Sequence, residues 1–315
     1  MTGRIKAWVV GAGGLVGSAI VRSGDLETFS AAPVPWGTPG AAPILHAELD
    51  RFVEWVADDQ WGLVWAAGAG VMHTSQSTLD DELAVFRSFC LRASDVLRRE
   101  GGGFYLVSSA GGVYAGSLDP PFRADTATQP LNAYGRTKLE QEDLALELLA
   151  PHLPVTIGRL ANVYGPGQDL TKQQGLITQL CLCALLNRPA TIFAPLSTLR
   201  DYIYVDDAAH LVTADVFRMA SASAAAGTAG ATRRVVCSGR STSIAEVVTM
   251  VGNVTGRRIP LIHTLGDGPF ILDLRLTASE EGVGRGAPPT SLEVGIALVQ
   301  QDLLRRLGDG ALALV

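Results

Sequence analysis

Charged residues and cysteines are both sparse in this chain. Only 18% of its 315 residues are charged, against about 25% in an average soluble protein, and the net charge is −6. No basic stripe of the kind that nucleic-acid binding needs is present. The composition therefore argues against a nucleic-acid partner. A hydrophobic share of 47% instead predicts a folded globular protein with a substantial core.

The cysteines are too few and too scattered to form a disulfide framework. They are Cys90, Cys181, Cys183 and Cys237. The pair at 181 and 183 lies in an apolar run without a second pair or a nearby histidine, a setting that favours buried thiols over a metal site. We therefore expect buried thiols and no metal.

Long apolar runs are missing as well. No stretch approaches the roughly 20 apolar residues that a membrane-spanning helix needs. The apolar start at residues 7–10 runs straight into glycines, so it predicts a strand rather than a signal peptide. These absences lead us to expect a cytoplasmic protein with no membrane association.

The first half of the chain alternates short apolar runs with stretches of helical periodicity, which is typical of an α/β fold with a doubly wound parallel sheet. The predicted strands are 5–10, 62–67, 104–108 and 155–160, with a further strand near 28–35, and the predicted helices are 79–99 and 133–149. After residue 165 the pattern is less regular. There we expect helices at 176–186 and 244–255, a strand at 190–194 and a surface loop at 220–232.

A run of glycines follows the first predicted strand and opens a helix. The residues concerned are Gly11, Gly13, Gly14, Leu15, Val16 and Gly17. Glycines at 11, 14 and 17 let the backbone turn tightly and approach a pyrophosphate, whose charge the N–H groups of the following helix can receive. The run therefore predicts a cofactor phosphate site, the alternative being a tight strand-to-helix turn that binds nothing.

The acidic residue that usually binds the adenosine ribose is missing after the second strand, where Val34, Pro35 and Trp36 stand. No arginine is present there to favour a 2′-phosphate. The choice between NAD and NADP stays open, with NAD favoured.

Tyr134 and Lys138 are four residues apart on a predicted helix and hence lie on one face of it. A phenol with a pKa of about 10 is a poor base at neutral pH, but a nearby ammonium favours its ionised form. Tyr134 could then take a proton from a substrate hydroxyl. The same spacing also occurs on solvated helix faces, so its position in the chain has to support this role.

That support comes from Ser108 and Ser109, which end a predicted strand about two dozen residues earlier. The carboxyl ends of parallel strands are where ligands bind in such sheets. A serine hydroxyl there can hydrogen-bond a reacting oxygen. We assign this role to Ser109 and keep Ser108 as the alternative.

Together, the glycine run, the strand-end serine and the Tyr/Lys pair resemble the extended short-chain dehydrogenase/reductases, in particular the NAD-dependent epimerase/dehydratase branch that acts on sugar nucleotides. The likeness continues at 159–167, 199–207, 238–244 and 288–293. It implies a Rossmann-type NAD(P)-binding domain at 1–165 and a smaller, mixed substrate-binding region at 166–315, with segments at about 200–240 returning to the first domain. It also implies a homodimer formed through helices 79–99 and 133–149.

The resemblance further assigns residues to the site. Asp50 resembles the family's adenine-contacting aspartate, and a surface carboxylate is an equally good interpretation of it. Ala66, Ala67 and Gly68 join the cofactor site, as do Tyr134 and Lys138, with Ser109 completing the catalytic group. Asn162 and Arg200 correspond to residues that bind the substrate's diphosphate, and a guanidinium suits that role because it forms forked hydrogen bonds with phosphate oxygens. Arg200 could instead pair with Asp201 or another carboxylate.

Some features depart from the family's pattern. Relatives that dehydrate sugars carry acidic residues after the strand-end hydroxyl, whereas Ala110, Gly111 and Gly112 stand here, which argues against a 4,6-dehydratase. Phe86 or a neighbour replaces the asparagine usual in the helix at 79–99. A second phosphate-binding arginine is missing at 264–267; Arg275 could take its place, although a surface residue is the favoured interpretation of it.

Three functions are consistent with these motifs. The favoured one is an NAD-dependent sugar-nucleotide epimerase that acts at C4 through a transient 4-keto sugar. The second is an NAD(P)H-dependent ketoreductase of a 4-keto sugar or another carbonyl. The third is a non-catalytic dinucleotide-sensing protein, which the presence of both Tyr134 and Lys138 disfavours.

Overall fold

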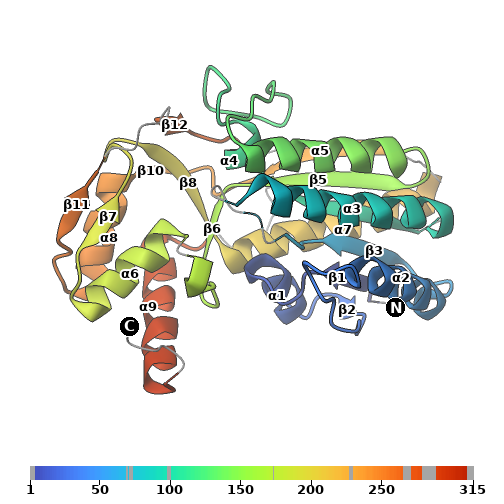
Figure 1. Cartoon of the computed structure of the whole chain (residues 1–315), viewed down its shortest axis with the longest axis horizontal. Coiled ribbons are helices and arrows are strands. Elements are labelled where there is room, and N and C mark those ends of the chain that lie inside the picture. The colour runs from blue at the N-terminus through green and yellow to red at the C-terminus, as the bar shows by residue number, and fades with distance from the viewer. Residues whose placement is uncertain are drawn as a thin grey trace.

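A computed structural model describes residues 4–68, 70, 74–97, 101–172, 174–226, 230–264, 271–278 and 289–310. The chain forms two lobes (Figure 1). The larger lobe is a parallel sheet between helices, and the smaller one holds short strands and the C-terminal helix α9 (Leu292–Gly308). None of the described helices has the length and apolar character needed to cross a membrane.

The larger sheet has six strands in the order β2-β1-β3-β4-β5-β9, with every neighbouring pair parallel. They are β1 (Lys6–Val10), β2 (Glu27–Thr28), β3 (Trp61–Trp65), β4 (Gly102–Ser109), β5 (Pro154–Leu160) and β9 (Gly230–Val236). The strand order reverses at β1, which makes the carboxyl ends of β1 and β3 the expected ligand edge. This topology confirms the doubly wound α/β fold expected from the sequence.

Helices cover both faces of this sheet, as the alternating apolar runs predicted. The helices α2 (Ala41–Val56), α3 (Gln76–Val96) and α5 (Ala133–Leu148) pack on one face, and α1 (Leu15–Arg22) and α7 (Val205–Ala226) pack on the other. The α2/α3 face is rich in aromatic side chains, including Trp8, Trp65, Phe86 and Phe89. Burying such rings supplies much of the stabilisation of the large lobe.

The smaller lobe is built around β8 (Leu199–Tyr204). It pairs with β6 (Asn162–Tyr164), β10 (Ser241–Ser243) and β12 (Asp273–Leu274). A separate pair joins β7 (Ala190–Ile192) to β11 (Leu261–His263), and α6 (Leu176–Leu186) and α8 (Ile244–Thr255) pack with α9 beside these strands. Only Ala161 separates β5 from β6, so one continuous stretch of chain links the lobes next to the ligand edge.

Two predicted segments differ from the structure. The strand expected near 28–35 is limited to β2, because Pro33 and Pro35 lack the N–H that a ladder needs and the segment after Thr28 leaves the sheet. Of the loop expected at 220–232, residues 220–226 end α7 and 230–232 begin β9, while 227–229 lie outside the described residues. Alanine is the strongest helix former, so the Ala/Ser composition extends α7 rather than ending it. The end of the predicted helix at 79–99 lies outside the described residues, and α3 ends at Val96.

Candidate active site

The predicted catalytic residues converge at the carboxyl edge of the large sheet. Ser109 is the last residue of β4 and Tyr134 lies in the first turn of α5. The helix starts there because the side chain of Asn132 accepts a hydrogen bond of 2.8 Å from the N–H of Gly135. A Cβ on Gly135 would collide with the carbonyl oxygen of Gly112, so only glycine lets α5 press against the loop after β4.

This close approach brings the tyrosine, the serine and the lysine together. A Cβ placed on Gly112 would lie 3.3 Å from Cε1 of Tyr134 and 3.5 Å from Cβ of Ser109, so the two side chains flank this glycine. The ammonium of Lys138 lies 6.0 Å from the centroid of the Tyr134 ring and is largely buried. The structure therefore places a buried ammonium beside the ring of Tyr134.

The two serines have different surroundings. Ser108 is 3% exposed and its hydroxyl donates a hydrogen bond of 2.6 Å to Oε1 of Glu142. The hydroxyl oxygen of Ser109 accepts a 3.1 Å hydrogen bond from the N–H of Gly112, which leaves its own O–H to donate to a substrate. The structure therefore argues against Ser108 as a substrate ligand and retains Ser109.

We expect the two alanine variants to separate these roles. Ser109→Ala should lower kcat by about 10²-fold, because it removes one hydrogen-bond donor to the reacting oxygen. Ser108→Ala should leave kcat nearly unchanged and cost about 1 kcal/mol of stability. Steady-state kinetics and chemical denaturation of both variants measure these effects. A larger loss of kcat in Ser108→Ala would reverse the assignment.

A buried ion pair lies beside the loop that follows Ser109, which we call the catalytic loop. The guanidinium of Arg159, on β5, donates to both carboxylate oxygens of Glu142, on α5, with a closest distance of 2.7 Å. It also donates to the hydroxyl of Tyr114 at 2.7 Å, and that hydroxyl donates to the carbonyl of Arg123 at 2.6 Å. Burial alone would lower the pKa of Arg159, but the hydrogen bonds and charge of Glu142 outweigh it and raise that pKa.

The sequence reasoning missed this ion pair. Its members are separated by 17 residues, and only the fold brings β5 and α5 together. The signal that could have found it is Glu142 itself, four residues after Lys138 and therefore one turn further along the same helix.

Lys138 has polar neighbours that the sequence did not predict. Its ammonium donates to Oε1 of Gln141 at 3.0 Å, and the amide of Gln141 donates to Glu82, on α3, at 3.5 Å. Glu82 also accepts the N–H of Gly70 at 3.2 Å. Phe86, by contrast, is fully buried against Trp65, so the asparagine usual in this helix has no polar replacement at that position.

The glycine turn has the geometry that a pyrophosphate requires. Gly11 has a φ of 90°, and a Cβ there would lie 2.6 Å from the nitrogen of Ala67. At Gly17 a Cβ would collide with the carbonyl oxygen of Gly11, so α1 lies directly against the turn. The first residues of α1 are Leu15 and Val16, and no side chain caps their N–H groups. These donors are available to an anion.

The outer side of the turn is open to a ligand. A Cβ at Gly13 would meet no atom within 4 Å, and Gly14 forms the extended N-cap of α1. Ala66 donates its N–H to the carbonyl of Val10 at 2.9 Å, so the segment after β3 runs beside the turn. A Cβ at Gly68 would lie 3.5 Å from Nζ of Lys138. Ala66, Ala67 and Gly68 thus lead from the glycine turn to the catalytic lysine, and these residues fit a dinucleotide.

Asp50 does not belong to this group. It lies nine residues into α2, about 13 Å along the helix from its first residue, and pairs with Arg92 of α3 at 2.7 Å. The residues on both sides of it are helical, and its side chain is 47% exposed beside Arg92. This position favours the interpretation of Asp50 as a surface carboxylate, and its contact with adenine stays a prediction.

Asn162 lies where the chain passes from the large lobe to the small one. A Cβ placed on Gly111 would be 3.9 Å from its amide oxygen and 3.6 Å from Cδ2 of Leu274. Leu274 pairs with Arg200 across the β12–β8 ladder. The strand that carries Arg200 thus approaches the loop after Ser109 from the opposite lobe.

Arg200 carries a guanidinium that the protein only partly satisfies. Its Nη1 donates to the carbonyls of Leu199 and Ile271, both at 2.8 Å. Burial lowers the pKa of Arg200, and within the described part of the chain no carboxylate forms an ion pair with it. Asp201 instead accepts hydrogen bonds from Ser238, and Arg275 is exposed and bound to Asp273. A half-buried guanidinium without a carboxylate partner suits an anionic ligand.

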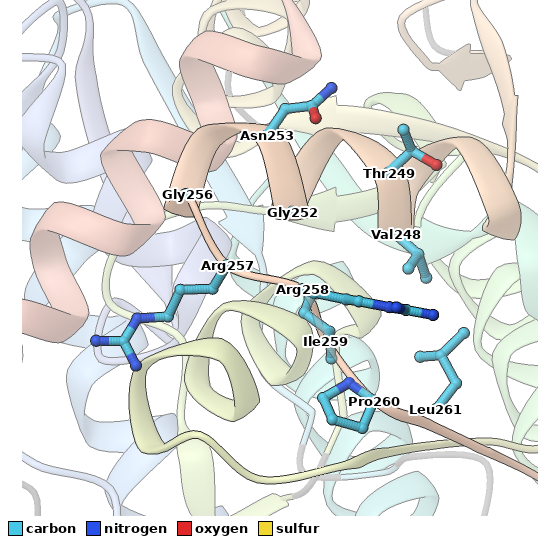
Figure 2. A pocket seen from close by; sticks show the side chains of 10 residues that line it. All are labelled: Val248, Thr249, Gly252, Asn253, Gly256, Arg257, Arg258, Ile259, Pro260 and Leu261. Carbon is cyan, nitrogen blue, oxygen red and sulfur yellow. The ribbon is translucent and has the colours of Figure 1, made fainter.

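A groove of about 690 Å³ lies elsewhere, in the small lobe (Figure 2). It is lined by Val248, Thr249, Gly252, Asn253, Gly256, Arg257, Arg258, Ile259, Pro260 and Leu261. The two arginine side chains extend to opposite sides of it (Figure 2). All of its lining comes from α8 and the segment that follows, which contribute no predicted site residue, so this groove is not the candidate site.

Comparisons with known proteins identify the family of this chain. Residues 7–216 match the profile of the NAD dependent epimerase/dehydratase family. The chain is 32% identical over 195 residues to the dTDP-L-rhamnose 4-epimerase of Burkholderia thailandensis, a match that covers 59% of this chain and 50% of that one. It is 29% identical over 141 residues to the dTDP-4-dehydro-6-deoxyglucose reductase of Escherichia coli, covering 43% of each. The chain therefore spans about half the length of the curated relatives that it matches.

Among solved structures, MoeE5 in complex with UDP-glucose and NAD superposes with a TM-score of 0.73 and 24% identity, over 96% of this chain and 99% of that one. At this identity the likeness concerns the fold, and it agrees with the Rossmann-type arrangement. The family match, which begins within β1 and ends within α7, includes the glycine turn, Ser109, Tyr134 and Lys138. The chain therefore belongs to the NAD dependent epimerase/dehydratase family, as its motifs predicted.

Proposed function

We propose that this protein is an NAD-dependent epimerase that inverts C4 of a nucleotide-activated sugar. The observation that carries the proposal is the convergence of Tyr134, Ser109 and Lys138 at the open edge of the sheet. Arg200 and Asn162 approach the same edge from the small lobe. The three residues of the sheet edge can act on the reacting carbon, and the two residues of the small lobe can bind a diphosphate.

Tyr134 moves the proton. With the ammonium of Lys138 beside its ring, it accepts the proton of the C4 hydroxyl, while Ser109 donates a hydrogen bond to the same oxygen. NAD, when bound, supplies the acceptor and later the donor of a hydride. The phenol of Tyr134 returns the proton once the sugar has presented its other face, so neither protons nor hydrides are consumed overall.

The small lobe holds the substrate during this exchange. The Arg200 guanidinium offers its remaining N–H donors to the diphosphate, and the Asn162 amide reaches the loop that follows Ser109. A substrate held by its diphosphate can rotate its flat 4-keto sugar without leaving the site. No acidic side chain stands at 110–112 to eliminate water, which favours epimerisation over dehydration.

The test is direct. The purified protein, incubated with NAD and a panel of UDP-, dTDP-, GDP- and CDP-sugars, is expected to convert one of them to its C4 epimer, as seen by NMR. Solvent deuterium should not appear at C4, because the hydride returns to the same carbon. A panel without any C4 epimer would count against the proposal.

A ketoreductase is the second candidate, supported by the match to a reductase of a 4-keto sugar. It would use the same three residues in one direction only. Net oxidation of added NADH or NADPH in the presence of a 4-keto sugar distinguishes it, because an epimerase leaves the total of reduced cofactor unchanged.

Arg200 offers a prediction about substrate binding. Arg200→Met should raise KM for the sugar nucleotide by about 10- to 100-fold with a smaller change in kcat, because the diphosphate loses a charge-assisted contact. Arg275→Gln is the matched control, since that exposed arginine is already bound to Asp273 and should leave KM nearly unchanged. Equal effects of the two substitutions would remove Arg200 from the substrate site.

We also propose that the protein works in the cytoplasm as a homodimer that pairs α3 and α5 with their counterparts. The outward faces of these helices are mostly polar, with Leu91 as the exposed large apolar residue among the described positions of this surface. Sedimentation at micromolar concentration tests the dimer, and a mass near that of the 33.1 kDa chain would refute it.

A further inference from the structure

The segment between β2 and α2 differs from a regular part of the sheet. Residues 29–40 form neither strand nor helix, and they carry no charged side chain. This stretch lies at the position from which an acidic residue would reach the adenosine ribose or an arginine would reach a 2′-phosphate. Any recognition of adenosine by this segment must therefore use uncharged groups.

Trp36 is the large side chain that this segment exposes. It is 43% exposed, and its ring meets the ring of Trp65 edge-on, with centroids 6.1 Å apart and an interplanar angle of 86°. Trp65 is itself fully buried, with Phe86 and Phe89 both at a centroid distance of 4.9 Å. The exposed indole therefore packs against a rigid cluster of buried aromatic rings.

The backbone around Trp36 is also restrained. Its N–H donates to the carbonyl of Val34 at 2.9 Å, and the hydroxyl of Thr38 donates to the carbonyl of Pro35 at 2.8 Å. Pro33 and Pro35 restrict φ on either side of Val34. A ring held in this way loses little conformational entropy when a ligand packs on it.

Its position relative to the glycine turn points to a ligand. Trp65 pairs with Val10, the residue before Gly11, so Trp36 packs against the strand end that lies beside the turn. Tyr134 and Lys138 lie next to β4, on the side of the glycine turn opposite Trp36. They therefore mark the nicotinamide end of a bound dinucleotide. With the pyrophosphate on the glycine turn, the adenosine end must extend away from them.

We propose that Trp36 forms the wall of the adenine subsite and stacks on the purine ring, in place of the acidic contact that this chain lacks. The inference rests on the proposed function, because it needs a dinucleotide in the cleft. Every base has a π face, so an exposed and rigid indole beside a phosphate turn is suited to this contact. Loss of such stacking is expected to weaken binding by roughly 5- to 100-fold.

The test measures binding rather than turnover. Dissociation constants for NAD and for ADP-ribose, which both carry the adenine, are measured by calorimetry on the wild type, Trp36→Ala and Trp36→Phe. We expect both constants to rise about 10-fold or more in Trp36→Ala and only a few-fold in Trp36→Phe, which keeps an aromatic face. Phe217→Ala is the control, since that ring is exposed on α7, on the opposite face of the sheet, and should change neither constant.

A third variant and a second signal guard against a folding defect. Trp36→Leu keeps an apolar contact with Trp65 but has no π face, so it should bind as weakly as Trp36→Ala with an unchanged circular dichroism spectrum. In the wild type, NAD should quench tryptophan fluorescence, and most of that change should vanish in Trp36→Phe.

The outcomes separate the two proposals. If the wild type binds NAD and the three Trp36 variants bind it equally well or more tightly, the stacking inference is overturned while the proposed function stands. If the wild type binds neither NAD nor ADP-ribose, the proposed function itself fails, and the inference fails with it.

Discussion

Tyr134→Phe is expected to lower kcat by about 10³-fold, within the range by which a positioned proton-transfer group accelerates a reaction. The substitution keeps the ring that packs beside Gly112 and Gly70 and removes only the hydroxyl. The proton of the substrate hydroxyl then has no acceptor at hydrogen-bond distance. Binding of NAD and of the sugar nucleotide should change far less than kcat, because the fold around the helix start is unaltered.

Single-turnover kinetics measure the expected loss of turnover, and an NAD titration measures the cofactor affinity, which should change far less. Arg136→Gln is a suitable control, since Arg136 is exposed on the same turn of α5 and has no role in the chemistry. Unchanged turnover in Tyr134→Phe would exclude the phenol as the base and would favour the non-catalytic, dinucleotide-sensing alternative. A loss of NAD binding without a loss of turnover per bound cofactor would instead make Tyr134 a cofactor ligand only.

Lys138 could be placed from the sequence because its relation to Tyr134 is local. Four residues on a helix are one turn, so the spacing alone puts the two side chains on one face once the helix exists. The glycine turn was predictable for a similar reason. Gly11 has a positive φ, and Gly17 packs directly against the carbonyl of Gly11. Both positions require glycine, so both are visible in the sequence.

The choice between Ser108 and Ser109 could not be made in that way. Both end the same strand, and they differ only because Glu142, 34 residues later than Ser108, accepts the hydroxyl of one of them. Asp50 shows a related difficulty. Its position is set by α2, whose apolar residues pack against the aromatic face of the sheet, and by Arg92, which lies 42 residues later in the chain.

The arginine of the buried ion pair shows how strongly such long-range contacts are expected to matter. Arg159 is 3% exposed and Glu142 is fully buried, and they join β5 to α5 next to the catalytic loop. Arg159→Met should reduce the free energy of unfolding by about 3–5 kcal/mol, because it leaves the carboxylate of Glu142 buried without a counter-charge. This is the largest loss of stability that we expect from a single substitution in the site.

The double variant identifies the cause of that loss. If the unpaired charge is responsible, Arg159→Met combined with Glu142→Leu should recover much of the stability, because an apolar pair of similar volume avoids the desolvation cost. Turnover should nevertheless stay low in the double variant, since Tyr114 loses the hydrogen bond from Arg159 and the loop that carries Ser109 loses that support. Denaturant unfolding and kcat measured on the same samples separate the two effects. Additive losses of stability would mean that the two side chains act independently, and the network would then have no part in positioning Tyr134 and Ser109.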